Sequence, residues 1–234
     1  MYKVIRAVDR FTDFLLLLFF LILLLIGAYT MYDTLLIYDA ARGEDLRSFK
    51  PMVTADGESV DWDMSALSDD VVAWLTVDDT GIDYPVLQGR DNNEYLNKDP
   101  FGEYSLAGSI FLDARNASDF SDPYSLIYGH HMEYGKMFGA LDAFLDQTYF
   151  DAHRTATLTV SDKVYHIKIF ACIEADASVD EIFSPTETDG TLEYVRQHAH
   201  IWREPEDEKL IALSTCKFPQ TTERIIVFGV LNDE

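Results

Sequence analysis

The stretch that decides the fold of this chain is Lys209-Leu210-Ile211-Ala212-Leu213-Ser214-Thr215-Cys216. Its short apolar run, bounded by polar residues, predicts a buried β-strand that ends at a cysteine. A strand end is rigid on one side and open on the other, which suits a nucleophile. Cys216 is therefore the first candidate catalytic residue, although a single cysteine on a strand is more often a core residue.

A second apolar stretch, Ile225 to Leu231, begins directly after Arg224. Two strands joined by the loop Phe218 to Glu223 would form a hairpin in which Cys216 and Arg224 lie side by side. This arrangement predicts a thiol beside a permanent cation.

Two adjacent histidines follow a third apolar stretch, in the sequence Tyr128-Gly129-His130-His131-Met132. A histidine at a strand end can reach the cysteine of a neighbouring strand in a barrel. Cysteine chemistry needs such a base or ion-pair partner. We take His130 as the candidate base and expect His131 to be a loop residue.

Short apolar stretches of strand length recur through the rest of the chain, with turn signals such as Asp78-Asp79-Thr80-Gly81 between them. Ser68-Asp69-Asp70 predicts the N-cap of a short helix ahead of Val71. Two further segments are expected to be helical, Leu141 to Phe150 and Leu192 to Trp202. The repeated strands predict a mainly β protein, either a barrel or a sandwich. The other predicted strands are Trp74 to Val77, Ile82 to Val86, Gly108 to Leu112, Leu126 to Tyr128, Thr155 to Val160 and Val164 to Ile173.

An unbroken apolar run, Phe14 to Tyr29, lies near the N-terminus, and Thr30 to Tyr32 can extend it. As a helix these residues are about 28 Å long, close to the thickness of a bilayer core. Lys3, Arg6 and Arg10 precede the run, so the positive-inside rule places the N-terminus in the cytoplasm and the rest of the chain outside the cell. A cleaved signal peptide has similar marks, but no A-x-A site follows closely, so we favour a retained single-pass anchor.

We expect three parts in the chain. Residues 1–39 are a cytoplasmic stub and a transmembrane anchor, and residues 40–63 are a polar linker. Residues 64–234 form the folded extracellular domain, which carries the candidate catalytic residues.

The charge balance argues against one class of partner. With 18 Lys and Arg against 41 Asp and Glu, the formal net charge is −23. Such a surface repels phosphate backbones, so nucleic acid is not an expected partner. Cys172 and Cys216 form no C-x-x-C unit, and His198 and His200 do not share a helix face, so we expect no metal site and no organic cofactor.

Taken together, these motifs resemble the sortase family of cysteine transpeptidases. Leu213-Ser214-Thr215-Cys216 is similar to the sortase T-L-x-T-C signature, and Tyr128-Gly129-His130 is similar to the sortase histidine motif. Arg224 completes the family's set, whereas Ala212 stands where the family often has Thr. The resemblance runs from about Val71 to Leu231. Several segments resemble class B members of the family in particular. They are Ile82 to Val86, Asp91 to Leu96, Gly108 to Asp113, the doubled histidine and the long segment before the cysteine strand.

The resemblance implies a closed sortase-type β-barrel of about eight strands, with short helices and one longer helix before the cysteine strand. It implies that Cys216 attacks the threonine carbonyl of a C-terminal sorting motif, LPXTG-like or NPQTN-like, and that His130 protonates the departing amine. Arg224 and the backbone N–H of Lys217 would stabilise the oxyanion or position the substrate. The residues expected to line the peptide groove are Asn92, Leu96, Ser214 and Thr215.

The partners implied by the resemblance are surface proteins or pilins that carry the motif, with a peptidoglycan precursor or a pilin lysine as the acceptor amine. Two other functions stay open: a catalytically silent, membrane-anchored binding module and a secreted cysteine protease. Papain-like proteases place the cysteine before the histidine, whereas here His130 precedes Cys216.

Overall fold

The computed structural model describes residues 2–40, 45–53, 60–161, 163–186, 190–206, 209–217 and 221–233. The chain divides into two compact units, Met1–Ala40 and Ala41–Glu234, and each is described by itself. The first unit is a single helix, and the second contains the strands.

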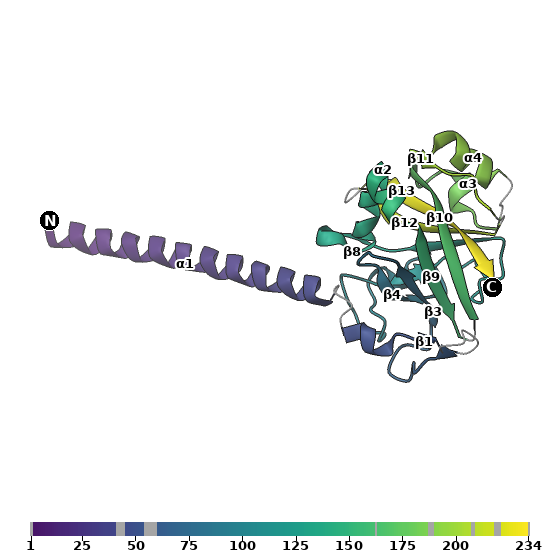
Figure 1. Cartoon of the computed structure of the whole chain (residues 1–234). Helices are drawn as coiled ribbons and strands as arrows, with labels where there is room; N and C mark the ends of the chain where they lie inside the picture. Colours follow the sequence, from purple (N-terminus) through teal and green to yellow (C-terminus); the bar gives the residue numbers. More distant parts are fainter. Residues whose placement is uncertain are drawn as a thin grey trace. The chain divides into compact units, whose positions relative to one another are not determined.

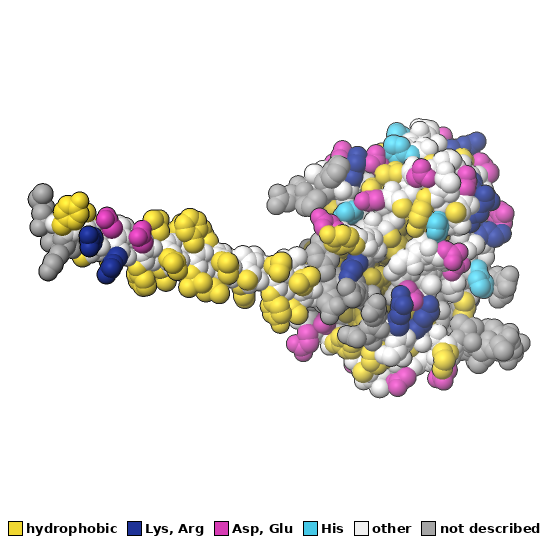
Figure 2. All heavy atoms as spheres, turned by 60° about the vertical axis from the view of Figure 1, so that its left-hand side comes forward, with side chains coloured by type: hydrophobic (Ala, Val, Ile, Leu, Met, Phe, Trp, Pro, Cys, Tyr) yellow, Lys and Arg dark blue, Asp and Glu magenta, His cyan; other side chains and the backbone are white. Residues whose placement is uncertain are grey.

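Helix α1 (Tyr2–Ala40) contains the predicted apolar run and extends it at both ends. Its segment Ile5–Ile37 has a mean hydropathy of 2.7, and side chains such as Leu17 and Phe20 are 69% and 64% exposed. Figure 2 shows hydrophobic side chains along this helix, with charged side chains near its amino end. Apolar surface of this kind is stable in an apolar environment. The helix is long and apolar enough to cross a membrane.

The second unit is built around the strands β3 (Val71–Val77), β4 (Asp83–Leu87), β5 (Ile110–Leu112), β6 (Tyr124–Tyr128), β9 (Thr155–Val160), β10 (Lys163–Asp176), β11 (Ile201–Trp202), β12 (Leu210–Cys216) and β13 (Glu223–Asp233). Among the described residues they form a nine-stranded sheet in the order β11-β10-β13-β12-β6-β5-β4-β3-β9. A further pairing of β10 with β9 closes the sheet into a barrel that leaves out only β11 (Figure 1). Neighbouring strands are antiparallel, except that β4–β5 and β6–β12 are parallel. The predicted closed β-barrel is confirmed.

Strand β12 lies between β6 and β13, and its first six residues are buried. This burial on both faces accounts for the continuous apolar run in the sequence. Successive side chains alternate between two hydrophobic clusters: Ile211 and Leu213 belong to one, and Ala212 belongs to the other. Ala212 is directly paired with Phe228 on β13, so a small side chain there packs beside a large ring.

Shorter elements connect and cover the barrel. They are η1 (Asp45–Phe49), β1 (Met52–Val53), β2 (Val60–Asp61), η2 (Glu94–Leu96), β7 (His131–Met132), η3 (Glu133–Gly135), β8 (Lys136–Met137), η4 (Phe138–Leu145), α2 (Gln147–Ala152), α3 (Asp180–Phe183) and α4 (Thr191–His198). Residues of α3 and α4 belong to the same hydrophobic cluster as Ala212 and Phe228. These two helices therefore cover the sheet face that Ala212 occupies.

The predicted helix after Ser68 is wrong, because Val71–Val77 form strand β3. Ser68 does organise a turn: its Oγ accepts a hydrogen bond from the N–H of Asp70 at 3.3 Å. The β-branched and aromatic residues that follow are buried by pairing with β4 and β9. Burial within the sheet therefore outweighs the local N-cap signal.

The predicted helix Leu192 to Trp202 is shorter than expected. Helix α4 ends at His198, and Ile201–Trp202 form β11, which pairs with β10. His200 thus lies outside the helix, and its N–H donates to the carbonyl of Cys172 on β10 at 2.9 Å.

The predicted helix Leu141 to Phe150 is interrupted. A 3₁₀ helix, η4, ends at Leu145, and α2 begins at Gln147. Between them, the carboxylate of Asp146 accepts a hydrogen bond from the N–H of Tyr149 at 2.9 Å and caps α2.

Part of the predicted linker, residues 40–63, belongs to the folded second unit, while residues 41–44 and 54–59 lie outside the described residues. Leu46 is buried in the main hydrophobic cluster, and Phe49 and Trp62 pack against it. Three apolar side chains of this polar stretch thus pack on the barrel, and Lys50 adds an ion pair to Asp83 of β4 at 2.8 Å.

Candidate active site

Cys216 and Arg224 are directly paired residues of the antiparallel strands β12 and β13. Directly paired residues of an antiparallel ladder project their side chains to the same face, with Cβ atoms about 4.5–5.5 Å apart. The thiol is partly exposed and is not in a disulfide. The ladder therefore places Cys216 and Arg224 side by side, as the sequence predicted. Residues 218–220 of the connecting loop lie outside the described residues.

The segment that carries His130 is joined to β12 just before the cysteine. In the parallel pairing of β6 and β12, Tyr128 is the partner of Ser214. The N–H of Gly129 donates to the carbonyl of Ser214 at 3.1 Å, and the hydroxyl of Thr215 donates to the carbonyl of Gly129 at 2.9 Å. These two bonds fix the residue before His130 against the two residues before Cys216.

Gly129 is required at this position by close packing. A Cβ atom there would lie 2.4 Å from Cδ1 of Ile110 and 2.7 Å from the ring of Phe138. Real Cβ contacts of this length do not occur, so the glycine allows β6 to approach its neighbours and sets the direction in which His130 leaves the strand.

The imidazole of His130 is held by a backbone carbonyl. Its Nε2 lies 2.7 Å from the carbonyl oxygen of Leu96. Because a carbonyl oxygen only accepts, Nε2 carries the proton in this contact. Nδ1 is then the ring nitrogen that can exchange a proton with a bound substrate.

Helix η2 places the Leu96 carbonyl. The carboxylate of Asp91 accepts hydrogen bonds from the N–H groups of Asn93 and Glu94, at 2.8 and 3.1 Å, and forms the preceding turn. Tyr95 is fully buried, and its hydroxyl donates to Asp70. The turn and the buried ring together fix the end of η2 beside His130.

A groove with a volume of about 300 Å³ runs along these residues. It is lined by all seven of the side chains that the sequence indicated, namely Asn92, Leu96, His130, Ser214, Thr215, Cys216 and Arg224. It is also lined by residues that sequence reasoning did not assign to it, namely Phe111, Tyr128, Gly129, Ala177 and Phe183. Ala177 and Phe183 come from the segment after β10, where no sequence motif pointed to the site.

Ser214 and Thr215 have different surroundings although both are almost fully buried. The hydroxyl of Thr215 is used in the bond to Gly129. The hydroxyl of Ser214 is buried without a hydrogen-bond partner among the described residues. A buried hydroxyl without a partner is costly, so the Ser214 hydroxyl is a hydrogen-bonding group that is left over at the groove.

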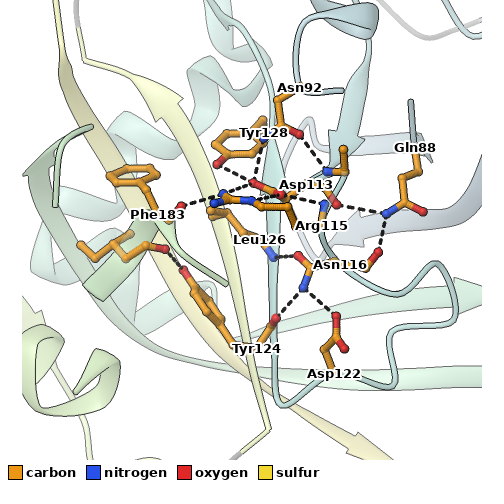
Figure 3. A network of polar contacts seen from close by, with 12 residues as sticks. Gln88, Asn92, Asp113, Arg115, Asn116, Asp122, Tyr124, Leu126, Tyr128 and Phe183 are labelled. Carbon is orange, nitrogen blue, oxygen red and sulfur yellow. Dashed lines mark hydrogen bonds and ion pairs between the residues drawn. The ribbon is translucent and has the colours of Figure 1, made fainter. Parts of the chain in front are cut away.

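The side-chain amide of Asn92 is held in one orientation (Figure 3). Its Oδ1 accepts from the N–H of Ala114 at 2.8 Å, and its Nδ2 donates to the carboxylate of Asp113 at 2.8 Å. An amide NH₂ carries two hydrogens, so one N–H of Asn92 is left over for another acceptor once its bonds to the described residues are made.

Lys217, the predicted oxyanion donor, uses its backbone N–H in the hairpin. That N–H donates to the carbonyl of Glu223 at 2.9 Å. The ammonium group lies 2.9 Å from the carboxylate of Glu174 and 3.7 Å from that of Glu223. Hydrogen bonding and charge attraction from Glu174 raise the pKa of Lys217.

The guanidinium of Arg224 lines the groove and also bonds to its own loop. Nη1 donates to the carbonyl oxygens of Thr221 and Glu223, at 2.8 and 3.2 Å. Arg224 therefore has further N–H donors, because a guanidinium carries five.

The second thiol, Cys172, lies within β10 and is fully buried. Burial raises its pKa to about 12, so it is a poor nucleophile at neutral pH. Cys216 is the thiol that a reagent or a substrate can reach.

The fold and the groove define a closed β-barrel protein with a cysteine-centred site. A family model described as Sortase domain matches residues 75–232. Sortase B of Listeria monocytogenes is 35% identical over 178 residues, which cover 72% of this chain and 72% of that protein.

Solved structures of class B sortases have the same fold. A Streptococcus pyogenes class B sortase involved in pilus biogenesis is 42% identical with a TM-score of 0.67, and the match covers 72% of this chain and 96% of that one. The Staphylococcus aureus sortase B–substrate complex is 26% identical with a TM-score of 0.67, and the match covers 73% and 83% of the two chains. The chain belongs to the sortase family, and its relatives are class B sortases.

Proposed function

We propose that this chain is a membrane-anchored cysteine transpeptidase that cleaves a C-terminal sorting motif after its threonine and transfers the acyl group to an amine. The observation that carries the proposal is the direct pairing of Cys216 with Arg224 at the end of a groove that His130 also lines. Membership of the sortase family supports the same chemistry.

In the first half-reaction, Nδ1 of His130 holds the proton of the Cys216 thiol, and Sγ attacks the threonine carbonyl as a thiolate, so that a C–S bond forms. The C–N bond of the scissile peptide then breaks, and His130 gives a proton to the departing amine. The product is a thioester on Cys216. In the second half-reaction, an acceptor amine attacks this thioester, the C–S bond breaks, His130 takes up the proton of the amine, and Cys216 is released as the thiolate of the starting ion pair.

Arg224 is the candidate for stabilising the oxyanion. Its charge is permanent, and an oxyanion donor of this type contributes about 3 kcal/mol in other enzymes. The N–H of Lys217 can share this role only if it leaves the carbonyl of Glu223. We therefore assign the larger part of the oxyanion stabilisation to Arg224.

Four side chains are proposed to bind the sorting peptide: Asn92, Leu96, Ser214 and Thr215. Asn92 offers its remaining N–H to a peptide carbonyl, and Ser214 offers a hydroxyl that has no partner in the described part of the chain. Leu96 supplies apolar surface, while Thr215 supports the groove through its bond to Gly129.

Helix α1 is proposed to anchor the enzyme, with its basic amino end in the cytoplasm and the barrel outside the cell. The substrates are surface proteins or pilins, and the acceptor is a peptidoglycan precursor or a pilin lysine. A relative whose structure is described as that of a pilus-biogenesis sortase makes the pilin route a specific candidate.

The proposal is tested with the full-length protein in detergent micelles and a panel of LPXTG-like and NPQTN-like peptides. Each peptide is incubated with an oligoglycine amine or with a lysine-containing peptide, and the products are identified by mass spectrometry. We expect a ligated product that disappears in Cys216→Ala and persists in Cys172→Ala.

The two other functions predict different products. A cysteine protease would give only the hydrolysed peptide, whichever amine is present. A silent binding module would give no product, although Cys216 would still react with iodoacetamide.

A further inference from the structure

Asp113 is a buried carboxylate just after β5 that receives hydrogen bonds from several directions (Figure 3). Arg115 binds it through two parallel contacts, Nε to Oδ1 at 2.8 Å and Nη2 to Oδ2 at 2.7 Å. Asn92 donates to Oδ2 at 2.8 Å, and the hydroxyl of Tyr128 donates to the same oxygen at 3.0 Å. One carboxylate thus holds an arginine, an amide and a phenol.

The carboxylate is ionised at neutral pH. Burial by itself would raise the pKa of Asp113, but the hydrogen bonds from Arg115 and Asn92 outweigh burial, and the pKa lies below its ordinary value. Burial and the nearby charge of Asp113 raise the pKa of Tyr128, so its hydroxyl remains a donor.

Arg115 extends the network to a third part of the chain. Its Nη2 also donates to the carbonyl of Phe183, the last residue of α3, at 2.7 Å. Asn92, Tyr128 and Phe183 come from three separate segments, and all three line the groove. Asp113 and Arg115 do not line it themselves, so they act on it through the residues they hold.

We propose that Asp113 and Arg115 are positioning residues that fix the three groove walls and thereby set the affinity for the substrate peptide. This inference rests on the proposed function. The carboxylate orients Asn92 so that one N–H is left for the peptide, and it orients the ring of Tyr128. Arg115 ties both of them to the end of α3.

An arginine is the side chain that this role requires. A guanidinium can bind a carboxylate with two parallel bonds and still donate to a carbonyl, whereas a lysine ammonium has no such planar fork. Arg115→Lys therefore keeps the charge and loses the link between the carboxylate of Asp113 and the carbonyl of Phe183. Arg115→Met keeps much of the side-chain volume but removes the charge and also the hydrogen bonds to Asp113 and Phe183.

The chain offers a matched control. Arg203 also donates to an aspartate, Asp151, and to two backbone carbonyls, those of Phe150 and Ile169. It lies outside the groove. Arg203→Met therefore removes a comparable set of contacts without touching the groove walls.

The test measures KM and kcat of thioester formation for full-length wild type, Arg115→Met, Arg115→Lys and Arg203→Met. The rate at which iodoacetamide alkylates Cys216 and the thermal midpoint are measured on the same samples. We expect both Arg115 variants to raise KM about tenfold while kcat changes much less. The alkylation rate should stay at the wild-type value, and Arg203→Met should keep the wild-type KM.

The inference is overturned if Arg115→Met has the wild-type KM, or if its KM rises no more than that of Arg203→Met. If Arg115→Met does not fold, Arg115→Lys and Tyr128→Phe, which removes only the hydroxyl bonded to Asp113, decide the question. A wild-type KM in both rejects the inference, and a raised KM in both supports it. A wild-type enzyme that forms no thioester with any peptide rejects the proposed function instead, and with it this inference.

Discussion

Cys216 and Arg224 face each other as directly paired residues at the end of the β12–β13 ladder. The pairing of the two strands thus places the thiol and the cation side by side in the protein without a ligand. Pre-organised charge of this kind stabilises an oxyanion without reorganisation at the moment of reaction.

Arg224→Ala should lower the rate of thioester formation by about 10²–10³ because it removes the permanent charge beside the reacting carbonyl. Arg224→Lys should recover only part of the rate because lysine lacks the planar fork. The measurement is single-turnover acylation with a peptide that the wild type uses. Arg196→Ala, on the exposed side of α4, is the control and should react like the wild type. A wild-type rate in Arg224→Ala would contradict the proposed role.

Gly129→Ala should destabilise the protein by about 1–3 kcal/mol because the new Cβ would overlap the side chains of Ile110 and Phe138. It should also slow acylation, since His130 is the next residue and would be displaced. Thermal unfolding and acylation are measured together. Gly27→Ala is the matched control, because nothing lies within 4 Å of a Cβ at that position in α1. If Gly129→Ala melts and reacts like Gly27→Ala, the packing argument fails.

Asp83 should contribute to stability in a pH-dependent way. Burial alone would raise its pKa, but hydrogen bonds from Lys50, Trp74 and Thr76 outweigh burial, and the pKa is lowered. A carboxylate with a lowered folded-state pKa contributes stability that is fully present above the unfolded-state pKa of about 3.9. That contribution is lost as the pH falls through the folded-state pKa.

Asp83→Asn should therefore be less stable than the wild type at neutral pH, and the difference should shrink as the pH falls below about 4. Urea unfolding at several pH values measures this. Asp69→Asn, which changes an exposed carboxylate, is the control and should follow the wild type. A stability difference between wild type and Asp83→Asn that is independent of pH would reject the explanation.

The sequence was sufficient for the parts of the fold that rest on simple hydrophobic patterns. The run before Cys216 and the stretch after Arg224 correspond to β12 and β13, because a strand buried on both faces is apolar throughout. The predicted strand Thr155 to Val160 is β9 with the same bounds. The candidate site residues could be predicted as neighbours because a thiol, an imidazole and a guanidinium each stand at a strand end, and all three line the groove.

Long-range packing accounts for what the sequence did not predict. The N-cap signal at Ser68 was misleading because pairing with two other strands decides the conformation of β3. Phe183 was missed as a groove residue because a hydrogen bond from Arg115, 68 positions earlier in the chain, ties its carbonyl to the network at Asp113. No local pattern records such a contact.

The most direct test of the central claim is the intact mass of the full-length protein after incubation with a sorting-motif peptide and no acceptor amine. We predict an added mass equal to the peptide's acyl portion through its threonine. The added mass should be located at Cys216, be released by hydroxylamine, be absent in Cys216→Ala and be present in Cys172→Ala. If no adduct forms with any peptide of the panel while iodoacetamide alkylates Cys216 readily, the transpeptidase account is contradicted.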